Sequence, residues 1–491
     1  MDIAELAKRR GFFWQSSEIH GSLSGFYDYG PIGVLVKRRW EDLWRGFFLG
    51  LGEHFYEISP SLVMPEAVFK ASGHLESFVD PVVKCAKCGN VERADHILED
   101  SLKENFEGLS PAQLGEIIKK HHIRCDKCSG QLEEVGKMNM TFPVKVGTGK
   151  EARPAYLTPE TAQGAYVNFP QCFEVLRRRL PLGLAVVGKA FRNEISPRNS
   201  LIRMREFTQA ELQIFLDPST IGQHPRFREV EKRKLRLLPA GSRAVQEMTC
   251  TDALKKLPAF SVYHLARIQE FYLDALGIPK EKFRLRELSA EERAFYNTCH
   301  WDVELELGIG WKEVAGLHYR TDHDLAGHEK VSGQRMAITL DGRQFIPHVL
   351  EISMGVDRNL YALLDLFLVQ EKERAVLRLP RQLSPFDVAV LPLVNKDGLP
   401  EKAREVNALL RKEGFRTFFD SSGSIGRMYR RMDEIGGAAC MTIDYDSLKK
   451  QDVTLRDRDT MKQVRVPLKD LPQALRRFLQ GENIAKIGKI L

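Results

Sequence analysis

The clearest alternation of polar and apolar positions lies between Phe191 and Phe215, in the stretch FRNEISPRNSLIRMREFTQAELQIF. Two runs suited to β-strands flank a polar loop at 196–200, so the pattern predicts a β-hairpin with a long loop. Alternate residues of a strand share a face, which places Arg192 with Glu194 on the first strand. On the second strand the shared face carries Arg203, Arg205, Phe207, Gln209, Glu211 and Gln213. The opposite face is mainly apolar and is expected to pack into a core.

This polar face combines groups that suit a nucleotide and an amine. A solvated sheet face is the simpler interpretation of charged strands, but Phe207 would gain nothing from water between its charged neighbours. Arginine side chains make bidentate contacts with phosphate, and a flat aromatic ring offers a stacking surface for a base. Glu211, at the far end of the row, could hold an ammonium group. The pattern therefore favours a nucleotide at one end of the face and an amine at the other.

Other periodic segments outline a large mixed domain. VLVKRRWEDLWRGFFLGLG has apolar residues at helical spacing, and FYEISPSLVMP after it alternates like an edge strand. The segment 217–300 is expected to be a mostly helical, charged insertion, with FREVEKRKLRLL and LARIQEFYLDALG as amphipathic helices. His323 and His328 fall in the polar stretch DHDLAGHEKVSG and are interpreted as surface-loop residues rather than metal ligands.

A second stretch, EISMGVDRNLYALLDLFL, predicts a strand that ends at 351–353, a turn containing Gly355 and an apolar helix from about Val356. Arg358 then lies in the first helical turn, where the helix dipole disfavours a cation. A bound anion such as a phosphate would offset that cost. Arg358 is therefore a candidate phosphate or nucleotide contact.

From Phe386 onward strands and helices alternate, which predicts a compact α/β domain of about 100 residues. A basic surface is expected on this domain, although a solvated helix would explain its charges equally well. The residues assigned to that surface are Arg427, Arg430, Arg431, Arg456 and Arg458.

Composition narrows the class of protein only slightly. The 491 residues are 43% hydrophobic and 28% charged, as in ordinary soluble proteins, and the net charge of +7 permits a nucleic-acid partner without requiring one. No apolar run approaches the roughly 20 residues that span a bilayer, and the first residues lack the apolar core of a signal peptide. We therefore expect a cytoplasmic protein without a membrane partner.

Four of the eight cysteines form two close pairs, Cys85–Cys88 and Cys125–Cys128. Two such pairs in an intracellular chain predict a four-cysteine zinc site, since four thiolates complete a closed tetrahedral shell. Disulfides are the alternative, which a reducing compartment disfavours. A closed Zn²⁺ site is structural, so we assign these cysteines no catalytic role.

Several stretches together resemble the class II aminoacyl-tRNA synthetases. FRNE followed by RMREFTQAE is similar to their motif 2, GVDRNLYAL to motif 3, and the long helix with YEISP to motif 1, the dimer-forming element. GFYDYGPIG, SGHLESFVDP, RADH at 93–96 and LTPETAQG narrow the resemblance to the dimeric glycyl-tRNA synthetases of archaea, eukaryotes and some bacteria. The resemblance covers essentially the whole chain.

The resemblance implies an α+β fold, in which 1–380 form a catalytic domain around an antiparallel sheet and 386–491 form an anticodon-binding domain. The catalytic domain would contain the zinc-knuckle insertion at 84–139 and the helical insertion at 217–300. The implied reaction attaches glycine to tRNA(Gly) through a glycyl-adenylate, at the expense of ATP bound with Mg²⁺. The implied assembly is a homodimer formed through the motif 1 region, and we expect the loop at 197–199 to meet the tRNA acceptor end.

The same resemblance assigns site residues position by position. Arg192 would clamp the α-phosphate and the amino-acid carboxylate, while Phe207 and Arg358 would sandwich the adenine. With Arg192 and Arg358, Glu313 completes the set of candidate catalytic residues, as a Mg²⁺ ligand. The ATP-site positions are Arg192, Asn193, Glu194, Ile202, Arg203, Met204, Arg205, Glu206, Phe207, Glu313, Val314, Gly355, Val356, Asp357 and Arg358. The glycine-site positions are Arg93, Glu160, Phe207, Gln209, Glu211, Glu351 and Ser353.

Glycine agrees with the charges of this pocket, because the carboxylates of Glu160, Glu211 and Glu351 around one small site need a cation. A hydrophobic pocket rejects a smaller analogue by only about 10–200-fold, but no amino acid is smaller than glycine. Lack of room can exclude larger ones, so no editing domain is needed. Two alternatives remain. A non-catalytic synthetase-like protein would be expected to lose Arg192 and Arg358, and a synthetase for proline, threonine, histidine or serine would not be expected to carry this carboxylate set.

Overall fold

A computed structural model describes residues 3–104, 106, 109–197, 199–289, 292 and 299–491. The chain divides into two compact units. The sheet unit comprises 17–26 and 44–359, and the C-terminal unit comprises the residues up to 16, 27–43 and 360–491. The divisions at 43/44 and 359/360 fall within helices α2 (Pro31–Phe48) and α11 (Val356–Phe367). The boundary expected at 380–386 does not coincide with these units and stays a prediction.

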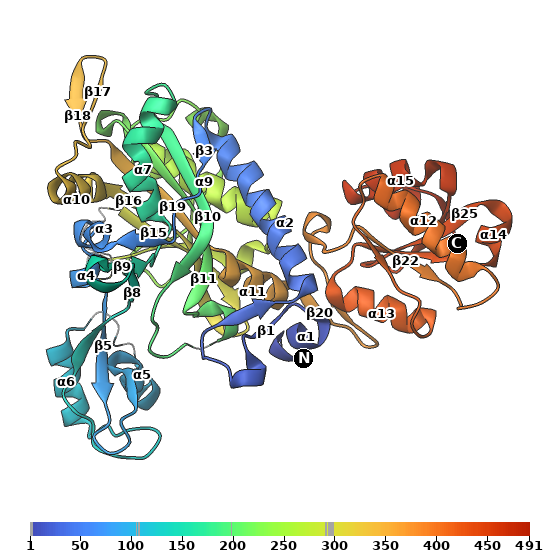
Figure 1. Ribbon diagram of the computed structural model, residues 1–491. Helices are drawn as coiled ribbons and strands as arrows, with labels where there is room; N and C mark the ends of the chain where they lie inside the picture. Colours follow the sequence, from blue (N-terminus) through green and yellow to red (C-terminus); the bar gives the residue numbers. More distant parts are fainter. Residues whose placement is uncertain (1–2, 105, 107–108, 198, 290–291, 293–298) are drawn as a thin grey trace. The chain divides into compact units, whose positions relative to one another are not determined.

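Among the described residues, a nine-stranded sheet forms the framework of the sheet unit (Figure 1). From β14 to β10 all neighbouring strands are antiparallel, whereas β12 joins β14 and β3 joins β10 in parallel. The strands in spatial order are β13 (Gln246–Thr249), β12 (Lys234–Leu238), β14 (Phe283–Glu287), β15 (Cys299–Leu307), β16 (Gly310–Thr321), β19 (His348–Gly355), β11 (Glu206–Leu216), β10 (Leu182–Phe191) and β3 (Phe55–Glu57). The expected antiparallel core is confirmed.

The hairpin predicted from the alternation is confirmed as β10 and β11, which pair from Leu182↔Phe215 to Phe191↔Glu206. Its apolar face is fully buried, with Ala210, Leu212 and Ile214 each 0% exposed. Burying one large aliphatic side chain contributes about 1.5–3 kcal/mol.

The prediction is wrong for Arg203 and Arg205, which precede β11 instead of extending its polar row. Asn199 and Ser200 adopt a left-handed backbone and Ser200–Ile202 form a 3₁₀ turn, so the strand period does not apply there. Arg198, in the loop expected to meet tRNA, lies outside the described residues.

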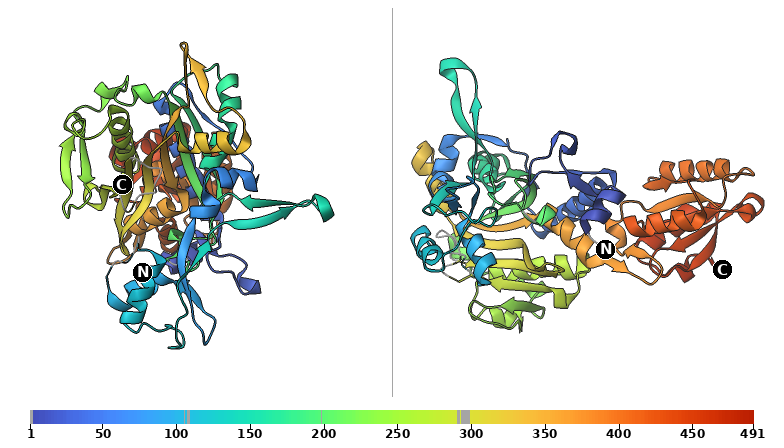
Figure 2. Two further views of the ribbon diagram at one scale, coloured as in Figure 1. Left: turned by 90° about the vertical axis from the view of Figure 1, so that its left-hand side faces the viewer. Right: turned by 90° about the horizontal axis from the view of Figure 1, so that it is seen from below.

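Helix α7 (Ala162–Val175) lies across β10 and β11 (Figure 1). Phe169 of α7 stacks on Phe215 of β11 with ring centroids 4.3 Å apart. A hairpin formed by β8 (Phe142–Val146) and β9 (Arg153–Leu157) extends outward as a long ribbon and pairs with the short β4 (Val63–Pro65) (Figure 2). Helix α7 therefore covers the Phe215 end of the polar face of β11.

The cysteine-bearing insertion has a small core of its own. It contains β5 (Val79–Lys84), β6 (Val91–Arg93) and β7 (Gly136–Asn139), with α5 (Ala94–Leu102) and α6 (Pro111–Lys120). Ser110 and Gln113 form a capping box that fixes the start of α6. Because so small a core stabilises a fold weakly, a metal crosslink would contribute strongly here.

The expectation of a mostly helical insertion at 217–300 is wrong. LARIQEFYLDALG does form helix α9 (Ala259–Glu270) and a π turn, but FREVEKRKLRLL forms only a 3₁₀ turn followed by strand β12. The end of that segment alternates as Lys-Leu-Arg-Leu, and Leu235 and Leu237 are both buried, which is a strand period. Together with β13 and β14, β12 therefore extends the main sheet.

The expected α/β domain is confirmed in the C-terminal unit. Its described residues form a six-stranded sheet covered by α12 (Leu399–Lys412), α13 (Ile425–Ile435), α14 (Tyr445–Lys450) and α15 (Leu471–Leu479). The strand order is β23 (Thr417–Phe419), β22 (Val388–Pro392), β24 (Ala439–Ile443), β25 (Asp452–Asp457), β26 (Gln463–Pro467) and β27 (Lys489–Ile490). Among the residues that the structure describes, no helix has the length and apolar character needed to cross a membrane.

Candidate functional site

Strands β11, β19 and β16 place the candidate substrate residues in register. Glu211 pairs with Ser353, and Ser353 pairs with Gly316. Two residues along each strand, Gln213 pairs with Glu351, and Glu351 pairs with His318. Paired residues project from the same face of a sheet. The structure thus brings Glu211, Glu351 and Ser353 together, as the sequence predicted.

Two of the three predicted carboxylates already have cationic partners. Arg320 contacts Glu351 at 3.1 Å and Glu160 at 3.5 Å, His74 lies 3.6 Å from Glu160, and His318 pairs with Glu351. Burial opposes ionisation of Glu351, but Arg320 and His318 nevertheless lower its pKa to about 2. The same Arg320 guanidinium and His74 outweigh burial and hold the pKa of Glu160 well below its usual range.

Glu211 differs because its hydrogen-bond partners are neutral hydroxyls. Thr161 donates to it at 2.7 Å and Ser353 at 2.6 Å, and the residue is only 3% exposed. Burial, together with repulsion from Glu351 and Glu160, raises the pKa of Glu211 to about 7. An ammonium group bound there would relieve both effects. Glu211 is therefore the carboxylate of this cluster that most needs a bound cation.

Sequence reasoning missed the residues that organise this cluster. Arg320 bonds to Asp324 at 2.8 Å, and Gln163 donates to both Glu160 and Asp324 at 2.9 and 3.0 Å. Tyr166 of α7 donates to Gln213 at 2.8 Å. The alternation rule used for the hairpin would have found His318 and Arg320, because they alternate with Gly316 on β16.

The structure corrects the assignment of His323 and His328 to a surface loop. His323–Ser332 form helix α10, and His328 is 4% exposed with its Nε2 2.9 Å from Gln163. Asp324 and His328 are polar residues that face the buried network through Gln163, whereas the residues from Lys330 to Gly333 are exposed.

On the nucleotide side, Arg192 lies between two aromatic rings. Its guanidinium carbon is 5.3 Å from the centre of the Phe207 ring and 5.3 Å from that of Phe78, and its Nε donates to the Pro159 carbonyl at 3.0 Å. Gln209, the next residue of the row, accepts a hydrogen bond from the Thr161 amide at 3.2 Å. The row from Phe207 to Glu211 thus joins Arg192 to the carboxylate cluster.

Arg358 occupies the first turn of α11, as predicted. Its side chain donates to the Ile202 carbonyl at 3.0 Å and forms an ion pair with Glu313 at 3.0 Å. The Glu313 carboxylate is the negative charge that the start of helix α11 favours. Both side chains remain partly exposed to solvent, Arg358 at 31% and Glu313 at 51%. A nucleotide could therefore reach both groups.

The other predicted ATP-site residues fall into two groups. Several are buried, so that only their backbone can face a ligand: Ile202, Met204, Val314, Val356 and Asp357. Gly355 precedes α11 directly, and a Cβ there would lie 3.3 Å from the Arg358 side chain. The second group surrounds the hairpin loop: Asn193, Glu194, Arg203, Arg205 and Glu206.

The loop residues connect the hairpin to neighbouring segments. The Asn193 amide donates to the Met140 carbonyl at 2.7 Å, and Arg205 donates to the Glu194 carbonyl at 2.8 Å. Arg203 lies 3.1 Å from the His96 ring nitrogen, and Glu206 pairs with Lys189 at 2.9 Å.

Arg93 is placed differently from the other predicted glycine residues. It forms ion pairs with Asp80 at 3.0 Å and Asp95 at 2.5 Å, lining a cavity of about 270 Å³ in the cysteine-bearing insertion. Burial acts to lower the pKa of Arg93, but Asp95, Asp80 and Glu194 raise it. The charged partners of Arg93 therefore come mainly from the insertion, and its assignment to the glycine site stays a prediction.

The four paired cysteines converge as predicted. Their sulfur atoms all lie within 4.8 Å of one another, with Cys85–Cys128 at 3.5 Å and Cys88–Cys125 at 3.7 Å. Hydrogen bonds from the Cys88 backbone lower the pKa of the Cys85 thiol to about 6. The two cysteine loops have the same backbone hydrogen bond: the Gly89 amide donates to the Cys85 carbonyl at 2.9 Å, and the Ser129 amide donates to the Cys125 carbonyl at 2.8 Å.

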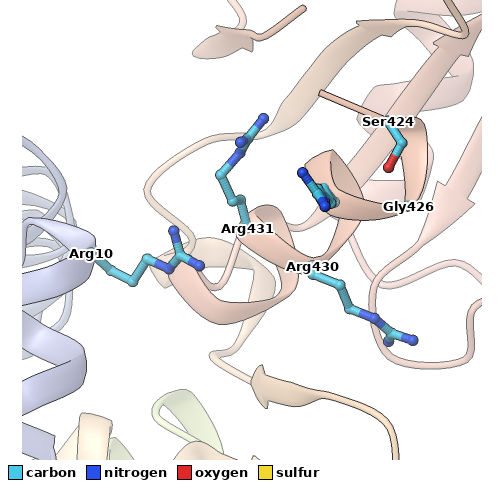
Figure 3. A pocket seen from close by; sticks show the side chains of 6 residues that line it. Arg10, Ser424, Gly426, Arg430 and Arg431 are labelled. Carbon is cyan, nitrogen blue, oxygen red and sulfur yellow. The ribbon is translucent and has the colours of Figure 1, made fainter. Parts of the chain in front are cut away.

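A second basic feature lies in the C-terminal unit (Figure 3). Arg10 of α1 (Ile3–Arg10) and residues of α13 line a cavity of about 500 Å³. The other residues in its wall are Ser424, which precedes α13, and Gly426, Arg427, Arg430 and Arg431 of α13. The sequence expectation is wrong for Arg456 and Arg458, which are 4% and 2% exposed. Arg456 is held inside the unit by Asp433 at 2.9 Å, and Arg458 donates to the Leu379 carbonyl at 2.6 Å.

Comparison with known proteins identifies relatives along the whole chain. Residues 387–478 match the family model of an anticodon binding domain. A glycine–tRNA ligase of Pyrococcus abyssi is 39% identical, with 98% of each chain covered. One from Methanothermobacter thermautotrophicus is 37% identical, with 96% of this chain and 98% of that protein covered.

Solved structures resemble the fold at lower identity. A prolyl-tRNA synthetase of Cryptosporidium parvum, complexed with L-proline and AMP, superposes with a TM-score of 0.59 at 14% identity. The match covers 99% of this chain and 76% of that one. This similarity establishes a shared fold.

Proposed function

Because this chain belongs to the glycine–tRNA ligase family, we propose that it attaches glycine to tRNA(Gly), using ATP and forming a glycyl-adenylate. The observation that carries the proposal is Glu211, a buried carboxylate hydrogen-bonded to Thr161 and Ser353 and lying in the same row as Phe207. This group needs a small cation, and the α-ammonium of glycine supplies one.

The reaction proceeds in two transfers. A carboxylate oxygen of glycine attacks the α-phosphorus of ATP, and the bond to the bridging oxygen of pyrophosphate breaks. A terminal ribose hydroxyl of the tRNA then attacks the glycyl carbonyl, its proton is released, and AMP leaves. Positioning and charge stabilisation lower both barriers.

This chain's residues divide those tasks by charge. Glu211 holds the ammonium, and Arg192, clamped between Phe78 and Phe207, holds the α-phosphate and the glycine carboxylate. Arg358 and Phe207 enclose the adenine. The exposed carboxylate of Glu313 suits Mg²⁺, a cation that prefers oxygen ligands and would neutralise phosphate charge.

The test is amino-acid-dependent ATP–pyrophosphate exchange across the twenty amino acids. We expect exchange with glycine and background rates with proline, threonine, histidine and serine. Exchange with none of the twenty would support a non-catalytic synthetase-like protein, and exchange led by another amino acid would replace glycine as the substrate.

The four cysteines also support a structural Zn²⁺ site. Zn–S bonds of about 2.3 Å imply sulfur separations of about 3.8 Å in a tetrahedron, close to the 3.5 and 3.7 Å found here. Such thiolates need a reducing compartment, so we place the protein in the cytoplasm. Elemental analysis of the purified protein should find one zinc per chain, and a metal-free folded protein would refute the site.

We further propose a homodimer formed through the motif 1 region. The edge strand β3 exposes Tyr56 at 39%, and the separate β4–β9–β8 sheet exposes Val63 at 39% and Val146 at 52%. Exposed apolar side chains on an edge strand favour association. Light scattering on the wild type should give twice the chain mass, and a monomeric mass would exclude the dimer.

A further inference from the structure

The strand beside Ser353 has a residue without a side chain, Gly316, and the space above it is filled. A Cβ built on Gly316 would lie 2.5 Å from Nε2 and 3.2 Å from Cε1 of His318. The imidazole ring therefore bends back over Gly316 and covers this part of the sheet.

The His318 ring is held in that position from several directions. Its Nδ1 pairs with Glu351, which is itself fixed by Arg320 at 3.1 Å and by Gln213 at 2.8 Å. The ring also packs edge-on against His300, with centroids 4.1 Å apart. Burial acts to lower the pKa of His318, but the Glu351 carboxylate raises it, which strengthens the pairing. Only 17% of the side chain is exposed, so the ring has little freedom to withdraw.

Glu211 lies two strands from Gly316, in the same row across the sheet. Its carboxylate accepts a hydrogen bond from Ser353 at 2.6 Å, and Ser353 is the register partner of Gly316 on the next strand. Neighbouring strands are about 4.8 Å apart. The His318 ring therefore covers the strand next to Ser353, the residue whose hydroxyl binds the Glu211 carboxylate.

We propose that His318 limits the amino-acid pocket to glycine, because its ring fills the space above Gly316 that a larger substrate side chain would enter. This inference rests on the proposed function, in which Glu211 binds the ammonium. A fixed wall explains discrimination without editing, because a methyl or hydroxymethyl group on the substrate would overlap a ring that its own partners hold in place.

The test compares His318→Ala with His318→Phe in amino-acid-dependent ATP–pyrophosphate exchange. The alanine variant opens the space, so we expect the ratio of kcat/KM for glycine to kcat/KM for L-alanine to fall at least tenfold. The phenylalanine variant keeps a ring but loses the pairing with Glu351, so glycine activity should fall while that ratio stays near the wild-type value. L-serine, with a slightly larger side chain, should gain less than L-alanine.

The outcomes separate the wall from a purely structural role. If His318 only stabilises Glu351, both variants will lose glycine activity equally and neither will change the ratio, which would overturn the inference. If the alanine variant unfolds, as thermal denaturation would reveal, His318→Asn provides the same test with a smaller opening and a retained hydrogen-bonding group. A wild-type protein without glycine-dependent exchange would instead refute the proposed function.

Discussion

At the scale of single residues, the carboxylate proposed to hold the glycine ammonium, Glu211, would link substrate binding to pH. Its pKa of about 7 means that most of the population carries a proton below that pH, when burial and Glu351 oppose ionisation. A protonated carboxyl cannot attract an ammonium. Glycine binding must therefore displace that proton, and the cost of doing so grows as the pH falls.

We predict that KM for glycine rises toward tenfold per pH unit below about pH 7 and is constant above it. The measurement is glycine-dependent exchange between pH 5.5 and 8.5. Glu211→Gln removes the titrating group, so its KM should be high but nearly independent of pH. A Gln variant with the wild-type pH profile would assign the titration to another group.

The raised pKa of Glu211 also affects the stability of the fold, and this effect has the opposite pH dependence: stability is lost as the pH rises, whereas glycine binding improves. A carboxyl whose pKa is raised from 4.5 to about 7 in the folded state binds protons more tightly when folded. Its contribution to the free energy of unfolding is therefore largest below pH 4.5 and is lost as the pH rises through 7. Glu211→Gln should raise the free energy of unfolding at pH 8, by about 1–3 kcal/mol, and change it less at pH 5. Urea denaturation at the two pH values measures this difference.

Residue roles were predictable from sequence where a single element sets them. Strand alternation alone located Phe207, Gln209 and Glu211 in one row. It could not show that Arg320 neutralises both Glu160 and Glu351, because those three residues come from different elements and meet only through the sheet register and the start of α7. Only when these ion pairs are known does Glu211 become the carboxylate of the cluster whose hydrogen-bond partners are neutral, the hydroxyls of Thr161 and Ser353.

At the scale of elements, the base of the cysteine-bearing insertion contacts the hairpin. Phe78 and Met140 flank the paired strands β5 and β7, where Val79 pairs with Asn139. Phe78 packs on Arg192, and the Met140 carbonyl accepts from the Asn193 amide at 2.7 Å. The insertion thus supports the strand end that carries Arg192, the arginine proposed to hold the α-phosphate.

We predict that Phe78→Leu lowers kcat for exchange about 3–30-fold, because one of two aromatic contacts that orient Arg192 is lost, a loss of about 0.5–2 kcal/mol. Phe78→Tyr keeps the ring face and should restore most of the rate. KM for glycine should change little in either variant, since Glu211 is untouched. Equal losses in the Leu and Tyr variants would argue against the ring contact.

Elements whose local pattern was ambiguous were the ones predicted wrongly. In FREVEKRKLRLL, leucines separated by charged residues fit both a helix face and a strand, and only pairing with β13 and β14 selects the strand. The π turn at Phe271–Ala275 and the αL residues of the hairpin loop likewise depend on tertiary contacts.

At the scale of the whole molecule, the two units contain the residues assigned to different substrates. The sheet unit contains the residues assigned to ATP and glycine, whereas the C-terminal unit contains the segment that matches an anticodon binding domain. Its arginine-lined cavity of about 500 Å³ includes Arg427 and Arg430 on α13 and suits the phosphates of a tRNA strand. Amino-acid activation and tRNA binding should therefore respond separately to mutation.

We predict that the double substitution Arg427→Ala, Arg430→Ala raises KM for tRNA about 10-fold or more in aminoacylation while leaving ATP–pyrophosphate exchange near wild type. Exchange needs no tRNA, so it reports the sheet unit alone. Each lost phosphate contact should also reduce the slope of log affinity against log salt by about 0.7–0.9. Arg476→Ala is the matched control, because Arg476 is 50% exposed on the same unit, pairs with Glu413 and lies outside the cavity wall. An equal rise in KM for the control, or a parallel loss of exchange in the double variant, would remove the cavity from the tRNA-binding surface.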